Sequence, residues 1–579
     1  MESKPVTINT IIMKALQKET EEDYTKFGMG RKIVWNDKLL SVWDRTYLAL
    51  DFNIHKSVSY QEKHRKNMIR KNPSLTKNEK KFLLDELQKS YDKFKISNHS
   101  RKNLKCNNCE KLHRATQYCE FCIQNYLKNN FRNWTSGNSK IDKLIQNCQR
   151  NTASPEFVIE WINYDQFENI KYLTEGGCAT IYTATWKVGR YHKWNPEKQI
   201  LERSRDQKVV LKRLNNSDSN NIHWFQEVTF SFTLDKASNK LAVCRGLTKD
   251  PITHDYMLVL KYYNTDLRQF LKNNYRSLTL LKKYMIIDKI TRSLFKMHEK
   301  RIMHRDLHSG NILYNASNLR WYISDLGLSG PVNKPSNSIY GNLPFVAPEV
   351  YCGQSYTEKS DIYSIGILMW EVITGKIPHG DHDYENNSHL ALAIASGYRP
   401  KIYKYIPLEY ANLMKQCWDA DPDNRPNTKI LKKNMRSLVK SLYEEMDQEQ
   451  PKSSFTENKD KQVIKNNKSN KNKGNESKGS EINKVQTSKL YTFNFPIKPR
   501  NATDEEQRAY ETKQFDFEIS EEMEQLYTKS IETDNCNKSC ADEECEIAGH
   551  AHNFKIKENF FSIICILLFL YFLFFVIYF

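Results

Sequence analysis

Hydrophobic positions along this chain recur with different periods, and each period predicts a different element. Residues 277–299 carry apolar side chains every three or four positions, which predicts a helix with one buried face. Residues 256–263 are mostly apolar, which is typical of a buried strand. Helical spacing also occurs within residues 1–100, among Lys and Asp side chains. Residues 560–579 contain no charged side chain and are long enough to cross a hydrocarbon layer of about 30 Å.

The length of the chain and a shift in its composition divide it into parts. With 579 residues, the chain exceeds what one hydrophobic core usually organises. Residues 451–490 consist largely of Asn, Lys, Ser and Gly, which cannot bury enough apolar surface to fold, so a flexible tether is expected there. The segment between Trp186 and Asp206, rich in Lys, Arg and Trp, is interpreted as a long surface loop.

The net charge of +19 is unevenly distributed along the chain. Residues 1–105 contain 23 Lys and Arg against 13 Asp and Glu, whereas residues 501–550 contain 15 acidic against 4 basic side chains. The positive charge therefore lies in the flanks as much as on any single face. Solvated charge is favoured over a nucleic-acid footprint, and nucleic acid is not expected as a partner.

Four of the thirteen cysteines form two pairs with metal-ligand spacing. Cys106 and Cys109 are followed by Cys119 and Cys122, and four thiolates can hold one tetrahedral Zn²⁺ in a small structural site. His113, between the pairs, could replace one Cys, although a solvent-facing His is favoured. The alternative is reduced cysteines in a loop. The cysteine spacing is unlike a secreted disulfide framework, so cytosolic thiols are expected.

Carboxylates and amides later in the chain have the spacing that phosphoryl transfer requires. Asp306 follows His-Arg, Asn311 comes five residues later, and Asp325 precedes Leu-Gly. One carboxylate can orient an attacking hydroxyl, while other oxygen ligands hold Mg²⁺. Upstream, the strand-like segment ending at Lys212 is followed fifteen residues later by Glu227, which is placed on a helix to pair with it.

These motifs resemble those of the protein kinases. The cysteine pairs, the segment Asn133–Asn138 and the segment Glu160–Leu173 also resemble tyrosine-kinase-like kinases that are expanded in arbuscular mycorrhizal fungi. This resemblance spans roughly residues 100–445. It implies a bilobal kinase fold, with ATP and Mg²⁺ as cofactors and proteins as substrates.

The resemblance also implies roles for individual residues. Asp306 would accept or orient the substrate hydroxyl proton, Asn311 and Asp325 would ligate Mg²⁺, and Lys212 would contact the α and β phosphates while paired with Glu227. The remaining nucleotide contacts would come from the phosphate loop and the hinge, at Gly176, Gly177, Leu260 and Tyr262. Structural roles are implied for an ion pair between Glu349 and Arg425 and for Asp361, which would brace the catalytic loop.

The sequence departs from the kinase pattern at several positions. In the glycine-rich loop only Gly176 matches, since Thr174 and Ala179 stand where the first and third Gly belong. Leu326 replaces the usual Phe after Asp325 and is expected to fill the same apolar socket. His308 follows Asp306 where Ser/Thr kinases usually carry Lys. The segment ending in Ala-Pro-Glu349 is more similar to the Ser/Thr form, so Ser/Thr specificity is favoured over Tyr.

The expected architecture is α+β. Its parts are a helical or partly disordered basic extension (1–100), a four-cysteine zinc-ribbon-like module (101–155), a protein kinase domain (164–442), a low-complexity linker and acidic tail (446–558) and one transmembrane helix (560–579). Lys555 and Lys557, upstream of the apolar segment, favour a cytosolic kinase domain on a tail-anchored, single-pass membrane protein.

The expected function is ATP-dependent transfer of the γ-phosphate to Ser and Thr hydroxyls of proteins, in signalling from a membrane. Two alternatives stay open within the kinase fold: Tyr specificity, and a catalytically weak or inactive pseudokinase scaffold whose altered phosphate loop no longer supports turnover. A zinc-ribbon nucleic-acid binder is a third reading, which would require basic side chains clustered about the cysteine pairs.

Overall fold

The computed structural model describes most of residues 33–512. The described ranges are 33–97, 104–152, 154–175, 179–217, 223–234, 241–327, 330–331, 339–380, 387–448, 488–491 and 495–512. They all belong to one compact unit, Met1–Asp516. The predicted transmembrane segment 560–579 lies outside the described residues. Among the described helices, none combines the length and the apolarity that a membrane crossing needs.

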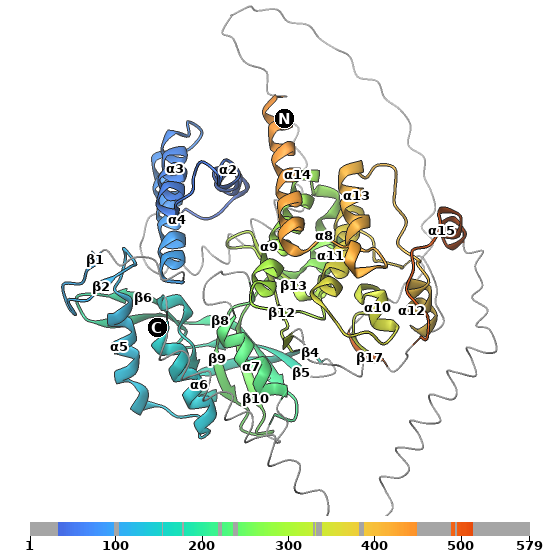
Figure 1. Cartoon of the computed structure of the whole chain (residues 1–579). Coiled ribbons are helices and arrows are strands. Elements are labelled where there is room, and N and C mark those ends of the chain that lie inside the picture. The colour runs from blue at the N-terminus through green and yellow to red at the C-terminus, as the bar shows by residue number, and fades with distance from the viewer. Residues whose placement is uncertain are drawn as a thin grey trace, which may run out of the picture. The chain divides into compact units, whose positions relative to one another are not determined.

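A six-stranded sheet forms the amino-terminal lobe of the expected α+β fold (Figure 1). Its strands, in spatial order, are β3 (Glu160–Trp161), β9 (Cys244–Lys249), β10 (Tyr256–Lys261), β8 (Gln207–Leu214), β5 (Ala179–Trp186) and β4 (Phe167–Glu175). All neighbours pair antiparallel except β3 and β9, which are parallel. Two helices, α6 (Ser139–Arg150) and α7 (His223–Thr233), pack on one face of this sheet through a shared apolar cluster.

Both faces of the central strands are buried, which explains why residues 256–260 are apolar without alternation. Tyr256 and Leu258 pack with the helices α6 and α7, whereas Met257 and Val259 point to the opposite cluster. Successive side chains of a strand point to opposite faces, so a strand covered on both sides carries a continuous apolar run. The strand predicted over this region is therefore confirmed.

The cysteine module and the insertion after Trp186 fold together. The module contains β1 (Leu104–Lys105), β2 (Leu112–His113) and α5 (Glu120–Asn129), and the insertion forms a hairpin of β6 (Arg190–Asn195) and β7 (Ile200–Ser204). Trp194 and Leu201 of the hairpin are buried against Ile123 and Leu127 of α5. The prediction of a surface loop is wrong here. The small module has too few apolar side chains for a core of its own, and Trp194 and Leu201 of the hairpin complete that core.

Within residues 33–97, three helices precede the cysteine module. They are α2 (Asp37–Leu48), α3 (Val58–Lys71) and α4 (Lys77–Ser97), and the last contains the helical spacing noted within residues 1–100. Buried Leu39, Ile69 and Leu83 belong to one core cluster of these helices. The helices start with side-chain caps, such as Asn36, whose Oδ1 accepts from Leu39 N (2.9 Å).

The carboxy-terminal lobe is mainly helical. The helix α9 (Leu280–His298) confirms the one predicted over 277–299, with Ile286, Ile290 and Leu294 buried against α14 and α11. The lobe's helices are α8 (Leu267–Asn274), α9, α10 (Pro348–Tyr351), α11 (Glu358–Thr374), α12 (Asn387–Ala395), α13 (Leu408–Cys417) and α14 (Thr428–Gln448). Its strands are β11 (Thr265–Asp266), β12 (Ile302–Met303), β13 (Ile312–Asn315), β14 (Arg320–Ile323), β15 (Gly330–Pro331) and β16 (Ile339–Gly341).

Part of the predicted linker is folded onto this lobe. The strand β17 (Lys489–Tyr491) pairs antiparallel with β16, and α15 (Asp504–Glu511) follows. Tyr491, Phe495 and Tyr510 are buried. The prediction of a disordered linker is wrong for residues 488–491 and 495–512, because composition averages over many polar positions and overlooks three aromatic side chains that find apolar partners.

Candidate active site

Two catalytic-loop side chains, Asp306 and Asn311, are held against each other. Asn311 Nδ2 donates hydrogen bonds to the Asp306 carbonyl oxygen (2.9 Å) and to Asp306 Oδ2 (3.2 Å). Burial disfavours ionisation of Asp306, but the adjacent His308 ring outweighs that effect, so the pKa of Asp306 lies below its ordinary value. Asp306 is therefore a carboxylate at neutral pH and can accept a proton there.

Asp361, in the first turn of α11, binds the backbone of the catalytic loop. Its two carboxylate oxygens accept hydrogen bonds from His304 N and Arg305 N, both at 2.9 Å. His298 Nε2 lies 2.8 Å from Asp361 Oδ2. Arg305 has a φ of 70°, a conformation that costs a non-Gly residue about 1–3 kcal/mol and persists only when its surroundings fix it. The buried carboxylate fixes it here.

The Lys212 ammonium joins groups from both lobes. Lys212 Nζ donates to Glu227 Oε1 and to Asp325 Oδ1, each at 2.7 Å. Burial alone would lower the pKa of Lys212, but the two carboxylates raise it above its ordinary value. Burial likewise opposes ionisation of Asp325, and Lys212 lowers the pKa of Asp325 to about 2. The cation and at least the Asp325 anion are thus both charged at neutral pH.

Strand register places Lys212 where it can reach Glu227. On β8, Val209 and Leu211 point into the cluster on the face away from the helices, so Lys212, the next residue, points to the face that α7 covers. Glu227 lies on α7 and is also buried. The fifteen residues from Lys212 to Glu227 therefore comprise the end of β8, the connection to α7 and the first turn of α7.

The segment around Asp325 is tied to the catalytic loop. His304 Nε2 donates to the Ser324 carbonyl oxygen (2.9 Å), and Gly327 N donates to Asp325 Oδ1 (3.2 Å). Asp325 itself has a φ of 58°. Leu326 is buried, as expected for a side chain that replaces Phe in an apolar socket. Ser324 N also donates to the Asn311 carbonyl oxygen (2.9 Å), so hydrogen bonds join the backbone at the two predicted magnesium-binding positions.

The remaining predicted nucleotide contacts are placed only in part. Gly176 and Gly177 lie outside the described residues, although the flanking strands β4 and β5 pair up to Glu175 and Thr180. Leu260 is half-buried near the end of β10, and Tyr262 follows that strand with Lys208 Nζ 4.1 Å from its ring centre. The structure thus brings Lys212, Glu227 and Asp325 into direct contact but leaves the phosphate loop undescribed.

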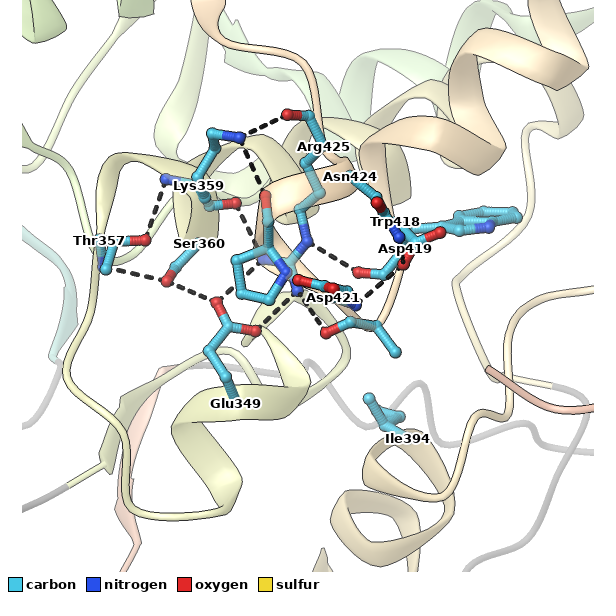
Figure 2. A network of polar contacts seen from close by, with 12 residues as sticks. Glu349, Thr357, Lys359, Ser360, Ile394, Trp418, Asp419, Asp421, Asn424 and Arg425 are labelled. Atoms are coloured by element: carbon cyan, nitrogen blue, oxygen red, sulfur yellow. Dashed lines mark hydrogen bonds and ion pairs between the residues drawn. The ribbon is translucent and has the colours of Figure 1, made fainter. Parts of the chain in front are cut away.

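An ion pair anchors the segment that follows β16, as Figure 2 shows. Arg425 Nη1 and Nη2 donate to Glu349 Oε1 (2.9 Å) and Oε2 (2.7 Å), and both side chains are almost fully buried. Arg425 Nε also donates to the Asp419 carbonyl oxygen (2.7 Å), and Ser360 Oγ donates to Glu349 Oε1 (2.8 Å). A bidentate pair with these extra bonds leaves few polar atoms unsatisfied, which is what burial of two charges requires.

Ser488 contacts both Asp306 and His308, and the sequence did not predict this contact. Ser488 Oγ donates to Asp306 Oδ1 (2.8 Å) and lies 3.1 Å from His308 Nε2. His308 Nδ1 accepts a hydrogen bond from Gly310 N (3.1 Å), so the ring proton is assigned to Nε2, which can donate to the Ser488 oxygen. No spacing rule connects positions 182 residues apart, although the aromatic residues after Ser488 in an otherwise polar stretch are a signal.

The four predicted metal-ligand cysteines converge in the amino-terminal module. Their sulfur atoms all lie within 4.8 Å of one another, with Cys106 Sγ 3.6 Å from Cys122 Sγ and Cys109 Sγ 3.6 Å from Cys119 Sγ. His113 is instead buried, with Nδ1 2.9 Å from the Ala115 carbonyl oxygen. The expectation that His113 faces solvent is wrong, because its ring closes the turn between β2 and α5.

Comparisons with known proteins agree with this geometry. Residues 167–435 match the family described as protein tyrosine and serine/threonine kinase. A probable serine/threonine-protein kinase roco8 of Dictyostelium discoideum is 31% identical over 215 residues, 35% of this chain and 11% of that protein. The dual specificity protein kinase zakA of the same organism is 31% identical over 176 residues, 28% of this chain and 22% of that protein.

Human mitogen-activated protein kinase kinase kinase 7 is 34% identical over 147 residues, 25% of this chain and 24% of that protein. The matched part thus spans less than a quarter of the length of each of these relatives. The relatives are of the tyrosine-kinase-like type that the motifs predict. Membership of the kinase family expanded in arbuscular mycorrhizal fungi stays a prediction.

Proposed function

Residues 167–435 form a protein kinase domain, and from this premise we propose that the chain is an ATP- and Mg²⁺-dependent kinase that phosphorylates Ser and Thr hydroxyls of proteins. The observation that carries the proposal is Lys212 Nζ, 2.7 Å from both Glu227 and Asp325. A kinase requires this Lys–Glu ion pair for activity. An idle scaffold has no need to hold three ionisable groups in this arrangement.

Each residue of the proposed site has a chemical task. When bound, Mg²⁺-ATP supplies the γ-phosphoryl group, and the metal neutralises its charge. Asn311 and Asp325 supply oxygen ligands for the metal, and Lys212 binds the phosphate chain. Asp306, an ionised carboxylate, orients the acceptor hydroxyl and takes its proton. Asp361 touches no reactant and acts by positioning the catalytic-loop backbone.

Ser/Thr specificity is supported by the similarity to a probable serine/threonine-protein kinase and by the surroundings of Asp306. His308 occupies the position of the Lys that Ser/Thr kinases usually carry, and its Nε2 lies 3.7 Å from Asp306 Oδ2. A donor at that point can hold a short aliphatic hydroxyl close to the carboxylate. A tyrosine ring would need the acceptor oxygen to sit farther from the substrate backbone.

The activity is tested with the purified full-length chain, labelled ATP and casein. Asp306→Asn should lower phosphate transfer roughly 10²–10⁴-fold, because the group that accepts the proton is lost. Asp165→Asn, at an exposed Asp two residues before the matched domain, is the control and should leave the rate unchanged. Phosphoamino-acid analysis of the product should give phosphoserine and phosphothreonine. No transfer by the parent chain with either Mg²⁺ or Mn²⁺ would favour the pseudokinase scaffold instead.

We also propose that the four cysteines hold a structural Zn²⁺. Tetrahedral coordination with Zn–S bonds of about 2.3 Å requires sulfur atoms about 3.8 Å apart. The 3.6 Å separations of the two sulfur pairs fit this requirement. Bound zinc would hold β1, β2 and α5 together and leaves no open coordination position, so it adds no catalytic chemistry.

The zinc proposal is tested by elemental analysis of the purified chain. One zinc per chain is expected, and Cys109→Ser should abolish it and lower the thermal unfolding temperature of the module. Cys352→Ser, at a half-buried Cys outside the cluster, is the control and should retain the metal. A parent chain purified without chelators that contains no zinc would contradict the proposal.

Membrane attachment through residues 560–579 is a further part of the proposal. It is supported by twenty consecutive uncharged residues and by Lys555 and Lys557 on their upstream flank. With this orientation the kinase domain is cytosolic. Alkaline carbonate extraction should leave the full chain in the membrane fraction and release a variant without residues 560–579. Release of both would exclude an integral membrane segment.

A further inference from the structure

Ser488, 182 residues after the catalytic Asp306, lies at the carboxylate that we propose as the proton acceptor. Ser488 Oγ donates its hydrogen to Asp306 Oδ1 at 2.8 Å, within the reach a general base needs. His308 Nε2, on the other side, lies 3.1 Å from the same oxygen. The hydroxyl proton thus already points at the carboxylate that would remove it. No other feature of the described molecule brings an aliphatic hydroxyl to Asp306.

The residues after Ser488 bind as an added strand. Lys489, Leu490 and Tyr491 pair antiparallel with Gly341, Tyr340 and Ile339. Strand addition is a general way to bind an extended peptide, because main-chain hydrogen bonds provide affinity without dictating sequence. The strand β16 that receives them directly precedes the segment that the Glu349–Arg425 ion pair anchors.

Gly341, on β16, lies beside Asp306. Its φ of 157° is unfavourable for other residues, and a Cβ there would lie 2.8 Å from Val346 Cγ2 and 3.6 Å from Asp306 Oδ1. A Cβ would thus overlap with the Val346 side chain, whereas its contact with the carboxylate would be an ordinary one. The positive φ and the contact with Val346 therefore favour Gly at this position of β16.

Residues 495–512 anchor the strand at a second place. Phe495 N donates to the Tyr351 carbonyl oxygen (2.9 Å), and Asn501 Oδ1 accepts from Ala420 N (2.9 Å). Gln507 forms two hydrogen bonds with the Arg399 backbone, accepting at 3.2 Å and donating at 2.6 Å. The buried Tyr510 ring stacks at an angle on Tyr398, with centres 4.9 Å apart.

A second Gly shows that the anchor is a fitted contact. Gly397 has a φ of 111°, and a Cβ on it would lie 2.2 Å from Ala502 N and 2.9 Å from Ala502 Cα. Backbone meets backbone here, so no side-chain movement could relieve the overlap. Residues 495–512 therefore dock on α12 and the turn after it with a closeness that a loosely associated tail would not have.

We propose that Ser488 is a phosphorylation site of the chain's own kinase domain, presented in cis by residues 488–491 and 495–512. The inference rests on the proposed kinase function and adds its first substrate. The Ser488 oxygen forms a bond to the γ-phosphorus of ATP, the bond from that phosphorus to the β–γ bridging oxygen breaks, and ADP leaves with those electrons. The hydroxyl proton goes to Asp306, and the product is phosphoserine.

The product cannot stay where the substrate was. A phosphoserine carries about −1.5 to −2 charge at pH 7, and at Ser488 it would face the Asp306 carboxylate at hydrogen-bond distance. Repulsion between these anions releases the strand from β16. Unphosphorylated Ser488 therefore blocks other substrates, and its modification opens the site to them.

The proposal is tested on the purified, phosphatase-treated full chain with Mg²⁺ and ATP. Mass spectrometry should find phosphate on Ser488, with a rate constant that does not change over a twentyfold range of enzyme concentration, as an intramolecular reaction requires. Ser437→Ala, an exposed Ser on α14, is the matched control and should keep this modification. In parallel, phosphorylation of casein should begin with a lag that pre-incubation with ATP removes.

Two variants separate modification from blockage. Ser488→Ala should keep the casein rate at its low starting value, since the strand cannot be released by charge. The double variant Gln507→Ala, Tyr510→Ala should remove the lag and raise the starting rate roughly tenfold or more, because it removes the anchor's hydrogen bonds and buried ring. Arg508→Ala, exposed on the same helix, should keep the lag.

The outcomes distinguish the two levels of inference. Casein phosphorylation with Ser488 unmodified would overturn the cis-substrate proposal and leave the kinase function intact. Modification of Ser488 with a rate that rises in proportion to enzyme concentration would overturn the intramolecular route. Absence of phosphate on both casein and Ser488 would remove the proposed kinase function itself.

Discussion

At the scale of single residues, burial decides which charged groups have large effects. Glu349 and Arg425 lie almost completely inside the protein, paired by two hydrogen bonds. Lys440 and Glu444 form an exposed pair on α14. In the buried pair, each charge is out of contact with water and is stabilised mainly by the other charge. In the exposed pair, water can solvate either charge when its partner is removed.

We expect Arg425→Ala to lower the free energy of unfolding by ~3–5 kcal/mol, because it leaves the Glu349 carboxylate buried without its counter-charge. Urea unfolding at pH 7 measures the change. Glu444→Ala is the control and should change stability by no more than ~0.5 kcal/mol. Equal effects of the two variants would mean that the buried pair carries no special weight.

Glu371 is a buried carboxyl whose titration falls near neutral pH. Burial raises its pKa to about 7, although Arg268 and the hydrogen bond from Ser309 Oγ (2.8 Å) act in the opposite direction. In the unfolded chain an ordinary Glu has a pKa near 4.5. Between pH 4.5 and 7, therefore, Glu371 is protonated in the folded protein and ionised in the unfolded chain.

The sign of the pH effect follows from this difference. The stabilising contribution of protonated Glu371 is complete below about pH 4.5 and is lost as the pH rises to about 7, by up to ~3 kcal/mol in total. Glu371→Gln should remove this slope from the pH dependence of urea unfolding between pH 5 and 8. Glu445→Gln, an exposed control, should keep it. A constant difference between parent and Glu371→Gln at all pH values would contradict the assignment.

At the scale of elements, the hairpin β6–β7 and the cysteine module depend on each other. Neither is large enough to have its own core, and Trp194 on the hairpin supplies a buried aromatic side chain to the module. The Arg203 guanidinium on β7 also pairs with Glu160 of β3, which connects the hairpin to the edge of the lobe's sheet. The insertion therefore bridges the module and the kinase domain.

Trp194→Ala should loosen this bridge by ~3–5 kcal/mol, the usual cost of truncating a buried Trp. Hydrogen exchange should accelerate in residues 104–129 and 190–204, while β8 and β10 keep their protection. Tyr172→Ala, at a mostly exposed position on β4, serves as the comparison and should leave exchange in the module unchanged. Unchanged exchange in residues 104–129 after Trp194→Ala would show that the module is stable without the hairpin.

At the scale of the whole molecule, segments from both ends of the described chain attach to the carboxy-terminal lobe. Arg436 on α14 donates from Nη2 to the carbonyl oxygens of Tyr47 (3.0 Å), Leu48 (3.1 Å) and Leu50 (2.9 Å) at the end of α2. The last carbonyls of a helix lack partners within it and favour a nearby cation. Lys289 Nζ adds a 2.6 Å ion pair with the buried Asp44.

Arg436→Ala should weaken attachment of the amino-terminal helices by ~2 kcal/mol, because three carbonyl groups lose a charged donor. Limited proteolysis should then release fragments containing residues 33–97 faster than in the parent chain. Lys440→Ala, on the same helix but exposed, is the control. Equal cleavage rates for parent and Arg436→Ala would show that other contacts are sufficient.

The sequence by itself determined what depends on local spacing. The separation of Asp306 from Asn311, of Lys212 from Glu227 and between the cysteine pairs identified groups that the structure brings into contact. These groups lie on one loop, or on a strand and the helix after it, so local geometry nearly fixes their distance. The apolar runs of β10 and α9 were predictable for the same reason.

Only the tertiary structure decided contacts between segments that no periodicity relates. Ser488 reaches Asp306, the hairpin β6–β7 covers the cysteine module, and Arg436 caps α2 because folding brings distant surfaces together. The composition of residues 451–490 predicted a tether, and composition could not show that this polar stretch leads into the strand Lys489–Tyr491. A few buried aromatic side chains and close backbone contacts at two glycines are enough to dock such a segment. The average hydropathy of the segment nevertheless stays that of a linker.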